Sequence, residues 1–344
     1  MTTFVSGPGL AAGLVLLALA PAALAALISA CITWRSMPLL QRYALARPNA
    51  RSSHRIPTPQ GAGIAVVAAT LLVAVPWAAW TYGALPLSLI GSAVLIALVG
   101  LVDDIRPLPV VLRLLLQAGA VAAVVFTAPE TARIVPALPL ALERGLILLA
   151  GIWFVNLVNF MDGLDLMTVS EVVPTTAALG LLGWSGDLSP SAALLATALC
   201  GAMLGFAPFN KPAAKVFLGD VGSLPIGLLL GWCLLELAWH GQPAAALLLP
   251  AYYLADSTIT LFRRVARREQ FWSAHRSHFY QRATDNGFSV PQVIGIVFAL
   301  NLGLAAIAII TVHAASTTVT VVGLLSGAIA IVTVLWRFSR PYAS

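Results

Sequence analysis

Five aspartates stand out in this chain because each lies at or just beyond the end of a long apolar run. They are Asp103, Asp104, Asp162, Asp165 and Asp220. Carboxylates gathered on one side of a membrane bundle would repel one another unless a cation offsets their charge. Carboxylate oxygens and a phosphate-bearing substrate are together the usual surroundings of Mg²⁺. The pattern therefore predicts a cation-assisted site for phosphate chemistry.

The first two of these aspartates, Asp103 and Asp104, are adjacent at the end of one apolar run. Neighbouring side chains at a helix end point in different directions, so the two carboxylates can serve two roles. One could contact a metal ion while the other accepts a proton. A solvated helix terminus is the alternative interpretation of this pair.

A second polar set recurs at every third position at the end of another apolar run. It comprises Asn156, Asn159, Asp162 and Asp165. Asn156 and Asn159 share one helix face because they are three residues apart. Gly163 is expected to break the helix, so that the last carboxylates turn into a pocket. A helix cap alone would need only one such residue, and we therefore interpret the set as substrate-binding.

A third segment, 209–223, joins amide, ammonium and carboxylate groups to glycines directly before the next apolar run. Its polar members are Asn210, Lys211, Lys215, Asp220 and Ser223. Gly219 and Gly222 permit close approach of the backbone to a phosphate, and the N-terminus of the following helix favours an anion. An ordinary capped loop is the alternative.

Two basic loops complete the candidate residues. The loop 263–289 interleaves basic and aromatic side chains, which could bind a diphosphate and a lipid headgroup. Arginines that set membrane topology would explain 263–268 equally well, but not the pair His275 and His278, which we interpret with Arg276 as part of the site. In the loop 35–60, His54 and Arg55 are candidates, and a plain surface loop is the alternative.

The composition indicates which elements must position these groups. The chain has 344 residues, of which 60% are hydrophobic and 9% are charged. A soluble domain carries about a quarter charged residues, so lipid must surround most of this chain. Since the basic residues lie in short connections between apolar runs, the net charge of +6 indicates membrane topology and no nucleic-acid partner. The three cysteines show no metal-ligand spacing and are expected to be packing residues.

A membrane span needs about 20 apolar residues, and this criterion predicts an all-α, polytopic membrane protein with about eleven spans. They are expected near 10–34, 61–82, 85–102, 110–128, 143–161, 166–184, 190–208, 221–239, 243–262, 290–312 and 317–337.

The positive-inside rule orients these spans. With the N-terminus periplasmic and the C-terminus cytoplasmic, only Arg133 and Arg144 of the 19 basic residues fall on the periplasmic side. The whole chain, 1–344, is predicted to be one membrane domain. Its cytoplasmic loops are expected at 35–60, 103–109, 161–166, 209–220 and 263–289.

In this order, the motifs resemble those of the polyprenyl-phosphate N-acetylhexosamine-1-phosphate transferases, glycosyltransferase family 4. This family includes phospho-N-acetylmuramoyl-pentapeptide transferase and enzymes that initiate O-antigen synthesis. Four signals carry the resemblance. They are the loop from Ser53-His54 to Gly63, Asp103-Asp104, the run Asn156-x-x-Asn159-x-x-Asp162-Gly163-x-Asp165, and Phe217-x-Gly219-Asp220-x-Gly222-Ser223.

The resemblance implies a bacterial inner-membrane enzyme whose active site faces the cytoplasm. It would transfer a sugar-1-phosphate from a UDP-N-acetyl amino sugar to undecaprenyl phosphate, with Mg²⁺, or alternatively Mn²⁺, as cofactor. Asp220 would be the metal ligand, and Asp103 and Asp104 would lie nearest the lipid phosphate, one of them as base. His278 would act near the diphosphate. The residues implied to bind substrate are Asn156, Asn159, Asp162, Asp165, Asn210, Lys215, His54, Arg55, His275 and Arg276.

The last loop departs from the family pattern. Tyr280 and Gln281 stand where further histidines are common, and His275 replaces the usual aspartate. This favours a 6-deoxy amino sugar donor, such as UDP-FucNAc or UDP-QuiNAc, over UDP-GlcNAc. A homodimer is compatible with the sequence. The competing hypothesis is a transporter or flippase of a phosphorylated lipid, although transporters usually place charged groups near the bilayer midplane.

Overall fold

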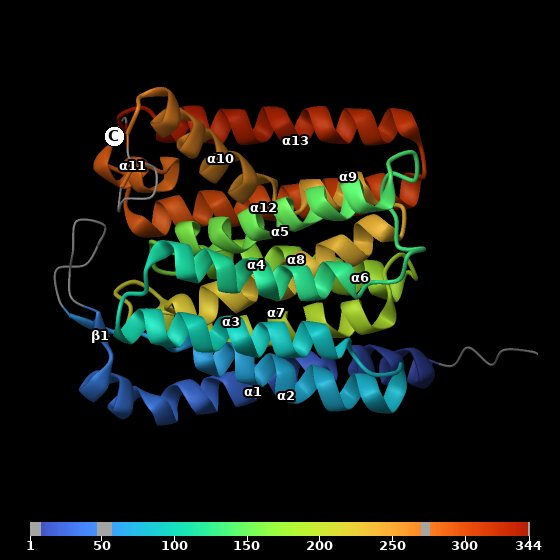
Figure 1. Ribbon diagram of the computed structural model, residues 1–344, viewed down its shortest axis with the longest axis horizontal. Coiled ribbons are helices and arrows are strands. Elements are labelled where there is room, and N and C mark those ends of the chain that lie inside the picture. Colours follow the sequence, from blue (N-terminus) through green and yellow to red (C-terminus); the bar gives the residue numbers. More distant parts are fainter. Residues whose placement is uncertain (1–7, 47–56, 270–275, 343–344) are drawn as a thin grey trace, which may run out of the picture.

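A computed structural model describes residues 8–46, 57–269 and 276–342 (Figure 1). The described residues form helices and one two-stranded sheet. The helices are α1 (Pro8–Tyr43), α2 (Gly63–Thr81), α3 (Leu87–Ile105), α4 (Val110–Phe126), α5 (Leu140–Met161), α6 (Met167–Trp184), α7 (Pro190–Asn210), α8 (Asp220–Trp239), α9 (Pro243–Leu248), α10 (Ala251–Ala266), α11 (Phe279–Asp285), α12 (Val290–Ala314) and α13 (Thr317–Phe338).

The predicted helical membrane architecture is confirmed. Eight of the described helices are long and apolar enough to cross a membrane: α1, α2, α3, α5, α7, α8, α12 and α13. Helix α4 is apolar but has only 17 residues. Large apolar side chains are exposed within the long helices, among them Leu72 in α2 and Leu98 in α3, as expected where a protein meets lipid instead of water.

The long helices lie side by side and run back and forth through the bundle (Figure 1). Helix α8 is central, since 83% of its most apolar segment is buried, compared with 22% in α1 and in α13. It packs against α3 on one side and α5 on another. The start of α8 therefore meets the ends of α3 and α5, and this end of the bundle gathers the candidate residues.

The sequence prediction missed three local features. The expected span 243–262 is divided into α9 and α10, because Pro250 has no N–H to continue the first helix. The seven-residue helix α11 forms within the basic loop. Strands β1 (Leu45–Ala46) and β2 (Thr58–Pro59) form a small antiparallel sheet, which an all-α prediction does not contain.

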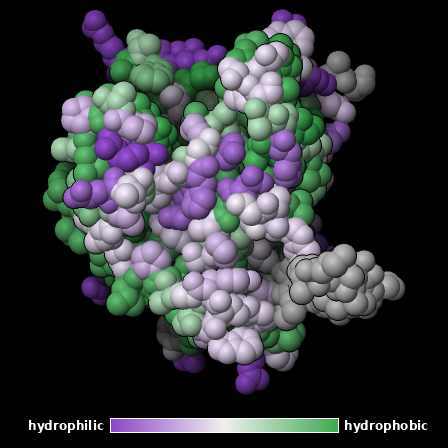
Figure 2. All heavy atoms as spheres, turned by 90° about the vertical axis from the view of Figure 1, so that its right-hand side faces the viewer, coloured by the Kyte–Doolittle hydropathy of each residue, from purple (hydrophilic) through white to green (hydrophobic). Residues whose placement is uncertain are grey.

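The two ends of the bundle differ. The end that carries β1, α11 and the described C-terminus is on the left of Figure 1. Figure 2 shows the opposite end, where hydrophilic residues lie across the middle of the surface and hydrophobic residues lie around its rim. This distribution is typical of a helical bundle whose flanks face lipid and whose ends face water.

Candidate active site

The site is built around a contact between the end of α3 and the start of α8. The side chain of Asp104 accepts hydrogen bonds from the backbone N–H groups of Asp220 and Val221, at 3.0 and 3.1 Å. Gln60 Nε2 donates to the same carboxylate. The close approach depends on Gly100, one turn before Asp104, where an added Cβ would lie 2.3 Å from the Asp220 carbonyl oxygen. The helix N-terminus that was expected to hold a phosphate therefore holds a carboxylate of the protein itself.

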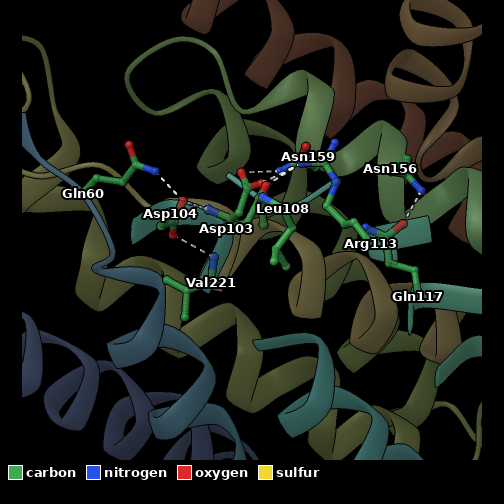
Figure 3. A network of polar contacts seen from close by, with 11 residues as sticks. Gln60, Asp103, Asp104, Leu108, Arg113, Gln117, Asn156, Asn159 and Val221 are labelled. Carbon is green, nitrogen blue, oxygen red and sulfur yellow. Dashed lines mark hydrogen bonds and ion pairs between the residues drawn. The ribbon is translucent and has the colours of Figure 1, made fainter. Parts of the chain in front are cut away.

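The other carboxylate of the pair lies in a different environment. Asp103 Oδ1 accepts the Leu108 N–H at 2.6 Å, and Asp103 Oδ2 lies 2.5 Å from Arg113 Nη1. The same guanidinium nitrogen is 3.7 Å from Asp220 Oδ2. Asp103 and Asp220 thus face one cation, Arg113, at the start of α4. Figure 3 shows Asp103 and Arg113.

Asn159 completes this group from α5. Its side-chain amide donates to Asp220 Oδ1 at 2.7 Å and lies 2.9 Å from the Ser223 hydroxyl. Asn156 lies one turn deeper and is buried; it donates to Gln117 Oε1 and to the Ile152 carbonyl, both at 2.8 Å. Of the two asparagines, Asn159 therefore contacts the aspartate cluster, whereas Asn156 links α5 to α4 (Figure 3).

The turn after α5 packs against the loop after α7. The backbone N–H of Ala214 donates to Asp165 Oδ2 at 3.1 Å, and the N–H of Leu166 donates to Asn210 Oδ1 at 2.7 Å. The third member of the turn, Asp162, accepts the Thr168 hydroxyl at 2.5 Å. The segments 161–166 and 209–220 thus lie together in the structure.

Asp162 lies just outside the helical span, and its carboxyl titrates abnormally. Its pKa is raised to about 7, mainly by burial and also by the negative charges of Asp104 and Asp165, while the Thr168 hydrogen bond works against the shift. A carboxyl group with such a pKa responds to any cation that enters the cluster.

The remaining predicted residues lie around this core or outside the described chain. His278 is buried at the start of α11, 3.2 Å from Asp256 Oδ1. Arg276 pairs with Asp285 at 3.2 Å, and Lys215 is exposed. His54, Arg55 and His275 lie outside the described residues.

The carboxylates fit the implied Mg²⁺ ion. Among the described residues, no three His, Cys, Asp or Glu side chains form a ready-made metal cage. Mg²⁺ does not need such a cage, because it usually binds one or two carboxylates and completes its shell with water and substrate phosphates. Asp103 and Asp220 meet this requirement, since both already lie within 4 Å of one cationic nitrogen.

Sequence reasoning missed several contributors. Arg113 was counted only as a topology residue, although a single arginine within an apolar run is itself a signal for a functional site. Gln117 lies four residues later on the same helix and carried no comparable signal. Asp256, in the expected span 243–262, was not among the candidate site residues. Its partners include His278 and the backbone of α11.

The fold and the site together define a multi-pass membrane protein with a carboxylate and arginine cluster at one end of its helical bundle. Residues 86–238 match the model of glycosyl transferase family 4, a segment that includes the aspartate pair, the asparagine and aspartate run, and Asp220. The resemblance inferred from the motifs is confirmed, and this chain is a relative of the polyprenyl-phosphate sugar phosphotransferases.

Three relatives illustrate the match. A decaprenyl-phosphate N-acetylglucosaminephosphotransferase of Mycobacterium leprae is 29% identical over 80% of each chain. A phospho-N-acetylmuramoyl-pentapeptide-transferase of Symbiobacterium thermophilum is 33% identical over 56% of this chain and 65% of its own length. A probable undecaprenyl-phosphate N-acetylglucosaminyl 1-phosphate transferase of Bacillus subtilis is 25% identical over 77% of this chain and 79% of its own length.

Proposed function

We propose that this protein transfers an N-acetyl-amino-sugar-1-phosphate from a UDP-sugar to undecaprenyl phosphate, which yields undecaprenyl-diphosphate-sugar and UMP. The observation that carries the proposal is the meeting of Asp103 and Asp220 on the Arg113 guanidinium at one end of the bundle. Such a site can bring together two anionic phosphates, whose mutual repulsion is the main barrier to this reaction. The names of the relatives support the same reaction type.

The cofactor we propose is Mg²⁺, with Mn²⁺ as an alternative ion. Asp220, together with Asp103, would hold it, and when bound it would neutralise the charge of the donor diphosphate and of the departing UMP. Asn159 orients the Asp220 carboxylate through its 2.7 Å hydrogen bond. Arg113 supplies a fixed positive charge beside the same oxygens.

The contacts favour different roles for the adjacent aspartates. Both oxygens of Asp104 accept backbone N–H groups of α8, so this side chain positions Asp220. Asp103 is therefore the carboxylate we assign to the lipid phosphate, whose proton it would accept. Removal of this proton needs little assistance, because the second pKa of a phosphate monoester is about 6. A phosphate oxygen then attacks the sugar-linked phosphorus in line, and the bond from that phosphorus to the UMP oxygen breaks.

The donor is assigned to the neighbouring turn and loops. Asp162, Asp165 and Lys215 lie on the two connections that pack together, Asn210 ends α7 beside them, and His278 directly precedes α11 near the end of α5. We assign the nucleotide and diphosphate to this side. The replacement of the usual histidines by Tyr280 and Gln281 favours UDP-FucNAc or UDP-QuiNAc as donor. The product would initiate an O-antigen or a related cell-envelope polysaccharide.

The topology we propose has eleven spans in the bacterial inner membrane. Helices α4, α6 and the pair α9–α10 would cross the membrane in addition to the eight longest apolar helices. An odd number places the two termini on opposite sides of the membrane, and we assign the N-terminus to the periplasm and the C-terminus, with the active site, to the cytoplasmic face. The concentration of basic residues at that face supports this orientation. A homodimer remains compatible with the proposal.

One assay tests the proposal. Purified protein in detergent is incubated with undecaprenyl phosphate, Mg²⁺ and, separately, UDP-GlcNAc, UDP-FucNAc and UDP-QuiNAc, and UMP release is measured. We expect UMP only when lipid and metal are both present, and none after EDTA treatment or in the Asp220→Asn variant. A folded protein that releases no UMP from any donor, with or without EDTA, would favour the transporter hypothesis.

A further inference from the structure

A second buried carboxylate, Asp256 on α10, organises the loop that carries His278. Its side chain is 0% exposed and accepts hydrogen bonds from both sides of the interface between α10 and α11. The donors are Tyr252 Oη at 3.1 Å, Thr260 Oγ1 at 3.3 Å, the Phe279 N–H at 3.0 Å, the Tyr280 N–H at 3.1 Å and His278 Nδ1 at 3.2 Å. A buried carboxylate with this many donors is satisfied without a metal ion or an arginine.

Two of these donors are the first backbone N–H groups of α11. A helix of seven residues is too short to be stable alone, and its N-terminal N–H groups need partners. The N-cap residue is His278, whose side chain does not cap the helix. Asp256 takes over this function from a different helix and so fixes where α11 begins.

The same carboxylate fixes the imidazole ring. Because a carboxylate only accepts hydrogen bonds, its contact with Nδ1 places a proton on that nitrogen. The ring also stacks on Tyr280, at a centroid distance of 5.8 Å, and lies 6.5 Å from the Phe160 ring. Both the tautomer and the orientation of His278 are thereby set, and in the neutral ring Nε2 is the acceptor.

The far side of α11 is tied to the end of α5. Tyr280 Oη donates to the Phe160 carbonyl oxygen at 3.1 Å, two residues before Asp162. An added Cβ on Gly163 would lie 2.2 Å from Tyr280 Oη, so the two segments are in direct contact. His278 is thus placed beside the turn that we assign to the donor.

We propose that Asp256 is a positioning residue for the sugar-phosphate transfer. It acts through His278, by keeping a proton on Nδ1 and holding the ring so that Nε2 faces the donor diphosphate, to which Nε2 donates a hydrogen bond when it is protonated. This role rests on the proposed function. Partners that orient a functional histidine in this way typically contribute about 10- to 100-fold to activity or affinity.

A spectroscopic experiment tests the positioning without any substrate. The protein is labelled with ¹⁵N-histidine, the His278 signals are assigned with the His278→Gln variant, and the ¹⁵N shifts report which ring nitrogen carries the proton. We expect the Nδ1–H tautomer in the wild type and its loss in Asp256→Asn. In that variant the amide NH₂ opposes either the Phe279 or the Tyr280 N–H, whichever way it is turned. Tyr252→Phe is the matched control: it removes one donor to Asp256, keeps the carboxylate and should keep the tautomer.

Kinetics then separate positioning from a general structural effect. Asp256→Asn should lower kcat about 10- to 100-fold with little change in KM, and should add no further loss in the His278→Gln background. The proposal would be overturned if the two substitutions lowered kcat independently, so that their effects multiplied in the double variant. A wild-type His278 that carries its proton on Nε2 and none on Nδ1 would also overturn it, and this measurement needs no folded variant. If the wild type releases no UMP, the proposed function fails, while the tautomer measurement still decides whether Asp256 holds the ring.

Discussion

The carboxylate of Asp104, at the end of α3, accepts the backbone N–H of Asp220, the first residue of α8, at 3.0 Å. One aspartate of the cluster thus caps the helix that presents another. The contact holds together two segments that are 116 residues apart. It also divides the adjacent aspartates by role, since Asp104 positions α8 whereas Asp103 faces the site. The predictions below test this division and the contacts around it.

The two aspartates should respond differently to the same substitution. In Asp104→Asn an NH₂ group opposes one of the α8 N–H groups, so we expect unfolding to become easier by about 1–2 kcal/mol, with lower turnover. Asp103→Asn keeps an oxygen for the Leu108 N–H and should lose turnover with a smaller loss of stability. Thermal unfolding followed by tryptophan fluorescence, together with UMP release, measures both effects. Equal destabilisation of the two variants would contradict the assignment.

Arg113 should be required for turnover, although it belongs to none of the four motifs that carry the family resemblance. Removing its charge leaves Asp103 and Asp220 facing each other without a fixed cation, so Arg113→Ala should reduce UMP release by about 100-fold or more. Arg113→Lys should recover only part of the activity, because an ammonium group cannot reproduce the guanidinium geometry. The control is Arg106→Ala, an exposed arginine on the connection that precedes α4, which should be near wild type. Similar losses in both arginine variants would mean that only the general positive charge matters.

Gly163 should not tolerate a side chain. The Cβ of Gly163→Ala would lie 2.2 Å from Tyr280 Oη, so α11 must shift, at a cost of about 1–3 kcal/mol and with lower turnover. Gly145→Ala, in the first part of α5, the helix that precedes Gly163, is the control because its Cβ meets nothing within 4 Å. Adding Tyr280→Phe to Gly163→Ala removes the clashing oxygen and should restore part of the stability. No such recovery would indicate that the loss arises elsewhere.

The raised pKa of Asp162 predicts how stability depends on pH in metal-free protein. The carboxyl titrates near 3.8 when unfolded and near 7 when folded. Between these values the folded state holds a proton that the unfolded state has released, so the free energy of unfolding should fall as pH rises from about 4 to 7. The slope from this group is at most about 1.4 kcal/mol per pH unit.

Asp162→Asn provides the control for this slope, because it keeps an acceptor for the Thr168 hydroxyl and cannot ionise. Unfolding in detergent with EDTA, measured across this pH range, should show a flatter profile for the variant than for the wild type. Parallel profiles would show that other groups produce the pH dependence.

The sequence predicted a polytopic helical membrane protein, because a helix surrounded by lipid must be long and apolar. It also predicted that the ends of the apolar runs around Asp103, Asn159 and Asp220 would lie together. It did not predict the break at Pro250, since other helices of this chain, such as α6 and α8, continue through an internal proline. Helix α11 was missed because seven residues with mixed polarity have no distinct periodicity, and its stability comes from Asp256 and not from its own sequence.

The amino-acid sequence alone determined the class of fold, the types of the candidate groups and the resemblance to a family, because hydropathy, residue type and local spacing are properties of a linear chain. Only the tertiary structure decided which partner each group has. It placed Asp104 against the N-terminus of α8 and Arg113 between the carboxylates of Asp103 and Asp220. It also paired Asn156 with Gln117 and His278 with Asp256. The contacts of Asp104 and Arg113 with Asp220 join helices that are distant along the chain, and the other pairings join consecutive helices. Their geometry depends on close helix packing, as at Gly100, which no local pattern in the sequence encodes.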